Sequence, residues 1–516
     1  MPSRTSPPPT GKVYLLGAGP GDPELVTARA LRRLREADVV LYDALVHPEL
    51  LEHARAGAEL IFVGKRAGRP SERQARIDQR MIEAAQAGKI VARLKGGDPY
   101  LFGRGSEEAE ALRAHGVELE IVPGVPSPLA AAAYAGISLS HRDLASSIAY
   151  VTATESSEKD RTSHDWAKLA TATQTLVIFM GMRKLGALME LLIEHGRSPE
   201  TPAAVVQWAS LPKQRCVIGT VSDIARRARE AGIGLPALTI VGEVVALRET
   251  LRWYDKKPLF GVRVLVTRPA HQTDELRTLL RDEGADPRCV PAIRVGPPAD
   301  PRPLAEAVAS ARRYRWIVLT SANGVRALFD EVDRQGLDAR AFGGARVAAI
   351  GPVTAEALLA RGIRADVMPD EYRGEGAAQA ILDADADLAG ARVLIPRAEV
   401  AREALPAMLR ERGAEVDVVP AYRTLGPAED EAFALRELVH GKAVDVLTFT
   451  SPSTVRELAG ALGEHEDAVR NFVVACIGPV TADAARERGW PVHVTATDYT
   501  ARGLVEALRA HYEEAA

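Results

Sequence analysis

The stretch KVYLLGAGPGDP (residues 12–23) sets a short apolar run directly before a glycine-rich turn. We predict a buried strand at Val13–Leu16, because a short apolar run bounded by a turn is typical of a strand inside a parallel sheet. The stretch from Pro23 to Ala37 has helical spacing, with an apolar face formed by Leu25, Ala28, Leu31 and Leu34. Glycines let a ligand approach the backbone, and a helix N-terminus offers free N–H groups. The stretch therefore predicts a strand–turn–helix unit suited to ligand binding, with a plain tight turn as the alternative.

The same alternation of apolar runs and helical stretches continues along the N-terminal half. The further strand candidates are Val39–Tyr42, Ile61–Val63, Ile90–Leu94, Leu119–Val122, Ile148–Val151 and Leu238–Val241. Alternating strands and helices predict parallel sheets with helices on both faces. We expect residues 12–250 to form this region, preceded by a disordered tail (1–11) and followed by a polar linker (251–260).

Beyond the predicted linker the chain repeats itself. The segment RVLVTR (263–268) matches RVLIPR (392–397), and GPVTA occurs at both 351–355 and 478–482. We predict that residues 261–516 form two similar α/β lobes, from the repeats 263–390 and 392–516. A cleft between two such lobes is a usual place for a ligand.

Composition excludes several classes of protein. A length of 516 residues predicts about three to five domains. The composition, 47% hydrophobic and 26% charged, is typical of globular proteins. A net charge of −4 gives no basic field for nucleic acid, and the three cysteines are too far apart for a disulfide scaffold or a cysteine metal site. The sequence contains no apolar run of about 18 residues and no signal peptide. We expect a soluble cytoplasmic protein with no metal, nucleic-acid or membrane partner.

Several separated motifs in the N-terminal half occur together in one known family. They are GAGPGDPELVT (17–27), VGKR (63–66), LKGGDPYLFGRG (94–105), VPG (122–124) and FMGM (179–182). With these motifs the chain resembles the tetrapyrrole methylase family, and within it the uroporphyrinogen-III C-methyltransferases. The resemblance implies two αβα subdomains around S-adenosyl-L-methionine, methylation of uroporphyrinogen III to precorrin-2, and a homodimer formed through this half.

The resemblance also implies site residues, each carried over by its motif. The S-adenosylmethionine site is expected to comprise Pro20, Gly96, Gly97, Asp98, Leu101, Pro126, Ser127, Met180 and Ala209. Asp43 is the expected proton acceptor and Lys65 the proton donor, while three arginines are expected to bind the carboxylates of the macrocycle: Arg66, Arg104 and Arg142. The alternatives are a turn or cap role for Asp43, a solvated loop lysine, a core position for Met180, and surface ion pairs for the arginines.

The C-terminal half resembles uroporphyrinogen-III synthase. The motifs are VTRP (266–269), TSANGV (320–325), VPAY (419–422) and FTSPS (449–453). The resemblance implies two flavodoxin-like lobes joined by two strands, with hydroxymethylbilane in the cleft between them. Ser321 and Ser451 precede predicted helices, where they fit carboxylate binding and simple helix capping equally well.

Tyr422 is the candidate catalytic residue of this half. The gapless alignment of the two repeats sets Tyr422 opposite Ile293, so packing alone does not require a hydroxyl at this position. The resemblance places the tyrosine in the synthase cleft, where its phenol could donate a hydrogen bond to the departing hydroxyl of hydroxymethylbilane and ease formation of the azafulvene cation. The alternative is a tyrosine whose ring is buried for packing.

Together these observations predict a bifunctional enzyme with an α/β fold. We expect a methylase fold followed by a two-lobed synthase fold, acting on hydroxymethylbilane and uroporphyrinogen III. One alternative is a methyltransferase with a non-catalytic, tetrapyrrole-binding or regulatory C-terminal module. Another keeps the methylase fold but acts on a later corrin precursor. The sequence leaves open whether the product enters the sirohaem or the cobalamin branch.

Overall fold

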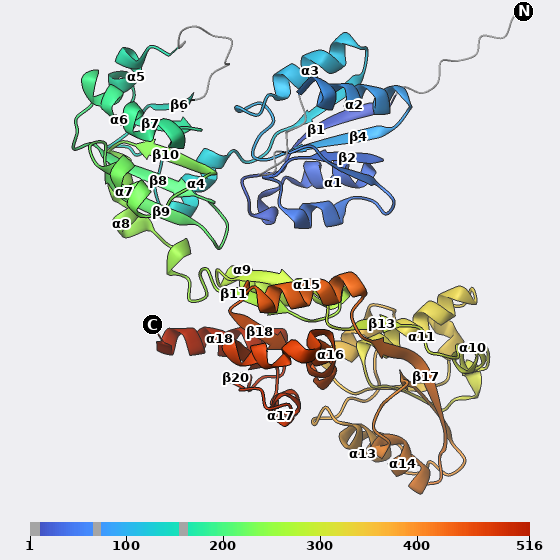
Figure 1. The fold of residues 1–516 in the computed structure, drawn as a ribbon. Coiled ribbons are helices and arrows are strands. Elements are labelled where there is room, and N and C mark those ends of the chain that lie inside the picture. Colours follow the sequence, from blue (N-terminus) through green and yellow to red (C-terminus); the bar gives the residue numbers. More distant parts are fainter. Residues whose placement is uncertain (1–10, 65–73, 154–163, 516) are drawn as a thin grey trace, which may run out of the picture. The chain divides into compact units, whose positions relative to one another are not determined.

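The computed structural model describes residues 11–64, 74–153 and 164–515 (Figure 1). The chain forms two compact units. The first extends to Val262 and also takes in Arg281–Asp286, and the second comprises Arg263–Leu280 and Pro287–Ala516. Each unit contains two five-stranded sheets. Among the described helices, none is both long and apolar enough to cross a bilayer.

The first sheet is fully parallel, as predicted. Its strands, in spatial order, are β3 (Glu59–Phe62), β2 (Val39–Tyr42), β4 (Ile90–Lys95), β1 (Lys12–Gly17) and β5 (Glu118–Val122). Side chains that alternate along β1 enter two separate cores, so helices cover both faces. One face carries α2 (Gln74–Gln86) and α3 (Gly105–Ala114), and the other carries α1 (Ala28–Glu36). The helix predicted from Pro23 is shorter, because Thr27 caps α1 by accepting a hydrogen bond from the Ala30 N–H at 3.2 Å.

The second sheet differs from the prediction because most of its strands are antiparallel. Its order is β6 (Ile148–Thr152), β7 (Thr175–Phe179), β10 (Ala237–Val241), β8 (Pro202–Gln207) and β9 (Arg215–Thr220), and only β6 and β7 run parallel. Only residues 208–214 connect β8 to β9, and a parallel crossover needs a dozen residues or more. One face carries α5 (Trp166–Ala172), α6 (Leu185–Glu194) and α7 (Ile224–Glu230), and the other carries α4 (Ser127–Ala135).

The predicted linker, residues 251–260, is a folded part of the first unit. It follows α8 (Arg248–Leu251) and contains a short 3-10 turn, η5 (Tyr254–Lys256). Tyr254 and Leu259 are fully buried, and the Tyr254 ring lies edge-on to Tyr134 with the ring centroids 4.7 Å apart. The linker prediction is therefore wrong: these apolar side chains, set among polar neighbours, anchor the segment to the unit.

The second unit consists of two lobes, each built on one sheet. The terminal lobe contains β12 (Asp286–Cys289), β11 (Arg263–Val266), β18 (Val446–Phe449), β19 (Val473–Cys476) and β20 (Val494–Thr495), with α9 (Asp274–Asp282), α15 (Glu429–His440), α16 (Pro452–Leu462), α17 (Pro479–Glu487) and α18 (Ala501–Ala515). The central lobe contains β13 (Arg294–Gly296), β17 (Glu415–Leu425), β16 (Arg392–Ala398), β14 (Trp316–Leu319) and β15 (Arg346–Ala349), with α10 (Arg302–Ala309), α11 (Ala322–Arg334), α12 (Pro352–Leu359), α13 (Gly374–Ala384) and α14 (Ala404–Glu411).

This strand order corrects the prediction that each repeat forms a lobe of its own. Strand β11 comes from the first repeat but pairs with β18 of the second, and β16 of the second repeat pairs with β14 of the first. The repeats thus exchange strands. Where they cross, β13 and β17 pair antiparallel, and Val295 lies opposite Thr424, its equivalent in the gapless alignment of the repeats. The duplication therefore forms one interlocked unit rather than two independent lobes.

Candidate functional site

Three loops at the carboxyl edge of the first sheet meet through their glycines. A Cβ atom on Gly17 would collide with the backbone of Gly124, and one on Gly124 would collide with the Gly97 carbonyl. Gly19 and Gly97 exchange two backbone hydrogen bonds, of 3.2 and 2.6 Å. Only glycine permits this approach, so the loops after β1, β4 and β5 pack closely against one another. We call the surface formed by Gly17, Gly19, Gly97 and Gly124 the glycine floor.

Two predicted carboxylates are bound into this floor. Asp98 accepts hydrogen bonds from the N–H groups of Gly124 at 3.0 Å and Tyr100 at 2.8 Å, one on each oxygen. Asp43 accepts one from Leu45 N–H at 3.0 Å and a longer one from Gly96 N–H at 3.4 Å. Each carboxylate oxygen keeps a second acceptor site, so the turn role of Asp43 and a role toward a ligand are compatible.

Further predicted residues lie next to these loops, in the segment that leads into α4 and in the segment after β8. The position that a Cβ on Gly97 would take is 3.8 Å from the Ser127 nitrogen and 4.0 Å from the Pro126 Cα. A Cβ on Gly21, the residue after Pro20, would lie 3.1 Å from the Ala209 carbonyl. The structure thus brings residues from both subdomains of the first unit together.

Strained backbone is concentrated in these loops. Among the described residues of the first unit, five non-glycine residues have positive φ angles between 50° and 68°: Phe102, Arg104, Met180, Trp208 and Ser210. Such conformations cost on the order of 1–3 kcal/mol each and are frequent at ligand-binding sites. Met180 is 46% exposed, so the alternative that it belongs to the core is wrong. The rings of Phe102 and Phe179 lie edge-on with centroids 4.8 Å apart, which joins the loop after β4 to the end of β7.

Sequence reasoning missed a buried network that joins the two subdomains. Asp22 is hydrogen-bonded to two residues that are distant in the sequence: its N–H donates to the Ser210 Oγ at 3.0 Å, and its Oδ2 accepts from the Tyr134 hydroxyl at 2.9 Å. Burial is the main reason that the pKa of Tyr134 is raised, so this hydroxyl remains a donor. No local pattern marks residues that lie 188 and 112 positions apart.

The two predicted arginines that the structure describes, Arg104 and Arg142, give no support for substrate binding over a surface role. Arg104 is exposed and its Nε lies 3.4 Å from Glu107, which is the surface ion pair named as its alternative. Arg142 is exposed in the turn closed by the paired backbones of His141 and Ala145. Lys65 and Arg66 lie outside the described residues.

In the second unit, Ser321 and Tyr422 lie in contact. Their side-chain oxygens are 2.9 Å apart, although the residues come from α11's N-terminus and from β17. Ser321 also caps α11 by accepting from the Gly324 N–H at 3.0 Å, and Ser451 caps α16 by accepting from the Thr454 N–H at 3.3 Å. Tyr422 is 9% exposed, and burial raises the pKa of its phenol. Capping and substrate contact are therefore compatible for Ser321.

Two neighbouring cavities lie on either side of this hydroxyl pair. One of about 650 Å³ is lined by Ser321 and Arg268, and one of about 710 Å³ is lined by Tyr422; Asn323 and Arg326 line both. The Arg268 Nε is buried and has no hydrogen-bond partner among the described residues, and burial lowers the pKa of its guanidinium. Sequence reasoning quoted the motifs that contain Arg268 and Asn323, the second of which directly precedes Arg326, but did not name these three residues as site candidates.

A third cavity, of about 500 Å³, contains equivalent tyrosines from both repeats. Tyr372 lies over Gly351, and Tyr499 lies over Gly478, where an added Cβ would be only 2.9 Å from the ring. The tyrosines are 55% and 60% exposed. Two pseudo-equivalent aromatic faces therefore line one hollow of the second unit.

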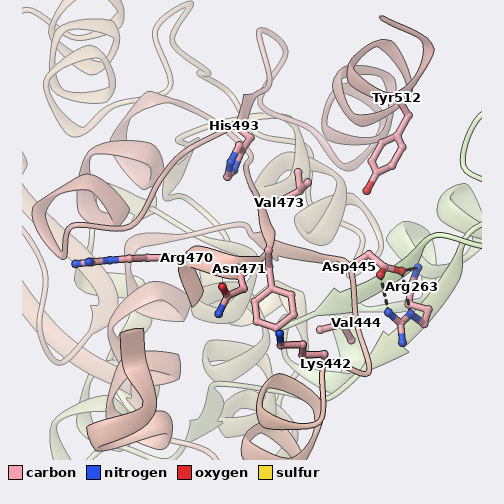
Figure 2. Close-up of a pocket in the computed structure, with 10 residues that line it drawn as sticks. Arg263, Lys442, Val444, Asp445, Arg470, Asn471, Val473, His493 and Tyr512 are labelled. Carbon is pink, nitrogen blue, oxygen red and sulfur yellow. Dashed lines mark hydrogen bonds and ion pairs between the residues drawn. The ribbon is translucent and has the colours of Figure 1, made fainter. Parts of the chain in front are cut away.

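A fourth hollow, of about 600 Å³, lies at the amino ends of β11, β18 and β19 (Figure 2). Figure 2 shows Arg263 paired with Asp445, and the two side chains approach to 2.6 Å. Lys442 and Arg470, which also line this hollow, are exposed. None of the predicted site residues that the structure describes lines this hollow. Asp43, Asp98 and Ser321 instead follow the carboxyl ends of strands, the usual binding edge of such sheets.

Comparison with known proteins identifies both halves. The family model for tetrapyrrole (corrin/porphyrin) methylases matches residues 12–225, and the model for uroporphyrinogen-III synthase HemD matches residues 274–506. The porphyrin biosynthesis protein HemD of Ruminiclostridium josui is 38% identical over 477 residues, covering 92% of this chain and 94% of that protein. The chain belongs to the tetrapyrrole methylases and the uroporphyrinogen-III synthases. The predicted family and fold class are thus confirmed.

Two further matches concern the methyltransferase domain. The uroporphyrinogen-III C-methyltransferase of Bacillus subtilis is 44% identical over 276 residues, which cover 54% of this chain and 57% of that protein. The solved structure of the uroporphyrin-III C-methyltransferase from Thermus thermophilus complexed with S-adenyl homocysteine is 41% identical. It covers 46% of this chain and 100% of that chain, with a TM-score of 0.40.

Proposed function

We propose that the synthase domain cyclises hydroxymethylbilane to uroporphyrinogen III and that the methyltransferase domain methylates this product to precorrin-2. The observation that carries the proposal is the presence of both family domains in one chain, with a relative that matches over nearly the full length. The product of the first reaction is the substrate of the second. The alternative of a non-catalytic C-terminal module has no observation in its favour.

For the methyl donor, the glycine floor fits a bulky ligand held against the backbone. The space that a Cβ on Gly97 would enter faces Pro126 and Ser127, so a side chain there would occupy the space proposed for the donor. We propose that Asp98 binds a ribose hydroxyl or the ammonium group of S-adenosylmethionine, with Pro20, Gly96, Leu101, Met180 and Ala209 as the remaining contacts. The donor supplies an electrophilic methyl group. The domain contributes alignment and exclusion of water, which are the main needs of such a transfer.

Asp43 is proposed to accept the proton that the macrocycle releases after methyl transfer; the pyrrole carbons carry no hydrogen, so this proton leaves from a pyrrole N–H or from a bridging methylene group. Its Oδ2 accepts a hydrogen bond from the N–H of Gly96, so the carboxylate lies beside the loop after β4 that is proposed to bind the methyl donor. Lys65 is proposed as the proton donor, and Arg66, Arg104 and Arg142 as partners for the carboxylates of the macrocycle. These roles follow from the family motifs and the chemistry of the residue types.

For the synthase domain, the cavities around Ser321 and Tyr422 contain arginines and hydrogen-bonding groups that can bind a polycarboxylate, and they are also lined by carboxylates: Asp274, Glu275, Asp330, Glu331 and Glu356. Arg268 brings an unpartnered guanidinium nitrogen, and the N-termini of α11 and α16 offer N–H groups beside Ser321 and Ser451. We propose that Tyr422 donates its phenolic proton as the carbon–oxygen bond of the hydroxymethyl group breaks. Water then leaves and an azafulvene cation remains. The pyrrole at the other end of the bound tetrapyrrole attacks this cation to close the macrocycle, and the proton released on ring closure returns to the Tyr422 phenolate.

The test uses the full chain in three incubations. Hydroxymethylbilane alone should give uroporphyrinogen III, uroporphyrinogen III with methyl-labelled S-adenosylmethionine should give precorrin-2, and all components together should give labelled precorrin-2 from hydroxymethylbilane. Formation of type I product only, which arises without a synthase, would support the non-catalytic module instead. Absence of label in the second incubation would refute the methyltransferase assignment.

The family resemblance also leads us to propose a homodimer joined through the methyltransferase domain and a cytoplasmic location. Sedimentation of the full chain tests the first, because a monomeric mass at micromolar concentration would contradict it. Fractionation of cells tests the second.

A further inference from the structure

A buried ion network lies beneath the donor loop, Gly96–Phe102. Glu108 on α3 is completely buried, and each of its carboxylate oxygens contacts a cation. Oε2 lies 2.9 Å from the Lys95 Nζ, and Oε1 lies 3.2 Å from the Arg93 Nε. The amide of Gln74 donates to the same Oε1 at 3.0 Å. Both cationic side chains are only 5% exposed.

Ions buried in a core lose their hydration, which raises the free energy of the folded state. Apolar side chains of the same volume would avoid this penalty, so a buried ion pair is weak evidence for stability. Its geometry, however, is directional, and it restricts where the participating backbone can lie. The network therefore suggests a role in positioning a neighbouring segment.

Lys95 and Arg93 share the carboxylate but differ in what they adjoin. Lys95 is the last residue of β4 and directly precedes Gly96. Its carbonyl accepts from the Ala18 N–H at 2.7 Å, and its Cε lies 3.4 Å from the position of a Cβ on Gly103, so the loop folds over its stem. Arg93 lies within the strand, and its Nη1 donates to the Leu94 carbonyl at 3.1 Å.

The charge of Lys95 also acts on the proposed proton acceptor. Burial lowers the pKa of Lys95 and the neighbouring Arg93 adds to this, whereas the carboxylates of Glu108 and Asp43 favour its charged form. Lys95 thus interacts with Glu108 by direct contact and with Asp43 through space. The N–H of the next residue, Gly96, holds Asp43 from the backbone side.

We propose that Lys95 is a positioning residue of the methyltransferase site. Its ion pair with Glu108 fixes the end of β4, and this sets the backbone of Gly96–Asp98 for the donor and the orientation of Asp43. The proposal rests on the proposed binding of S-adenosylmethionine at this loop. Lys95 itself is buried and does not contact the reacting atoms.

The two cations provide a matched pair of variants in the full chain. Lys95→Met and Arg93→Met each remove one buried cation and leave the other on Glu108. Both should lower the thermal midpoint. Lys95→Met should raise the dissociation constant for S-adenosylmethionine at least tenfold, whereas Arg93→Met should change it less than threefold. Lys95→Arg, which keeps the charge, should restore donor binding to within threefold of the unsubstituted protein.

Calorimetric titration with S-adenosylmethionine below both thermal midpoints measures these constants. Equal weakening by the two methionine variants, or donor binding unchanged in Lys95→Met, would overturn the positioning role and leave the network structural. If Lys95→Met does not fold, Lys95→Gln replaces it and is judged against the same limits. Failure of the proposed function is seen separately, as absence of donor binding in the unsubstituted protein.

Discussion

Removal of one hydroxyl, in Tyr422→Phe, separates chemistry from packing in the synthase domain. The phenylalanine keeps the buried ring, and Ser321 keeps its capping bond to the Gly324 N–H. The variant loses only the 2.9 Å hydrogen bond between the two hydroxyls. One such bond contributes about 0.5–1.5 kcal/mol. In a domain of this size 1 kcal/mol shifts the thermal midpoint by about 2–4 °C, so the fold should remain intact at assay temperature.

The expected loss of activity is much larger. A positioned general acid contributes about 10²–10⁴-fold to a rate, so type III product should fall at least about a hundredfold. Because burial raises the pKa of Tyr422, the phenol stays protonated through the neutral range and is available as a donor. The assay quenches the full chain after incubation with hydroxymethylbilane, oxidises the products and resolves the type I and type III isomers by chromatography.

Tyr314→Phe is the matched control. Tyr314 is also buried in the same lobe, at 2% exposed against 9% for Tyr422, and its hydroxyl donates to the Asp417 carboxylate at 2.8 Å. A bond to a charged group contributes about 1.5–3 kcal/mol, so this variant should lose more stability than Tyr422→Phe. It should nevertheless keep full synthase turnover, because Tyr314 precedes β14 at the sheet edge opposite Ser321. Full type III turnover in Tyr422→Phe, or an equal loss in the control, would refute the proposed acid role.

Three other outcomes are expected. Gly97→Val forces a side chain into a backbone with φ +70° and toward Ser127, so donor affinity should fall at least about tenfold while type III formation is unchanged; unaltered donor affinity would contradict the site. Asp43→Asn should slow methyl transfer by about 10²-fold or more with donor affinity within a few-fold, and equal losses in both would make Asp43 a donor ligand instead. Burial raises the pKa of Cys216 to about 11 and that of Cys476 to about 12, so at pH 8 both thiols stay protonated. Iodoacetamide should label these two only in the denatured chain, and rapid labelling of Cys216 or Cys476 in the folded chain, distinguished from Cys289 by peptide mapping, would show that this burial is wrong.

Local pattern was sufficient for much of the fold and for the place of the site. Apolar runs predicted the strands of the first sheet, because a strand buried on both faces needs consecutive apolar residues. The glycines of 17–21 and 96–97 marked these loops, since a Cβ on Gly17 or Gly96 would collide with a neighbouring loop and Gly97 has a positive φ angle. The motifs and their spacing then indicated the two families, which the comparisons confirm.

Tertiary structure alone decided which distant segments meet. The second sheet is largely antiparallel and the two repeats exchange strands, because a strand's partner depends on which apolar faces become buried together and not on its own sequence. Tyr254 and Leu259 turned an apparent linker into core for the same reason. Ser321 and Tyr422 form a hydrogen bond although they lie 101 positions apart in the chain. Lys95 contacts Glu108 only because α3 packs against the first sheet. Hydrogen bonds and ion pairs of this kind depend on which distant elements pack together, so no local pattern encodes them.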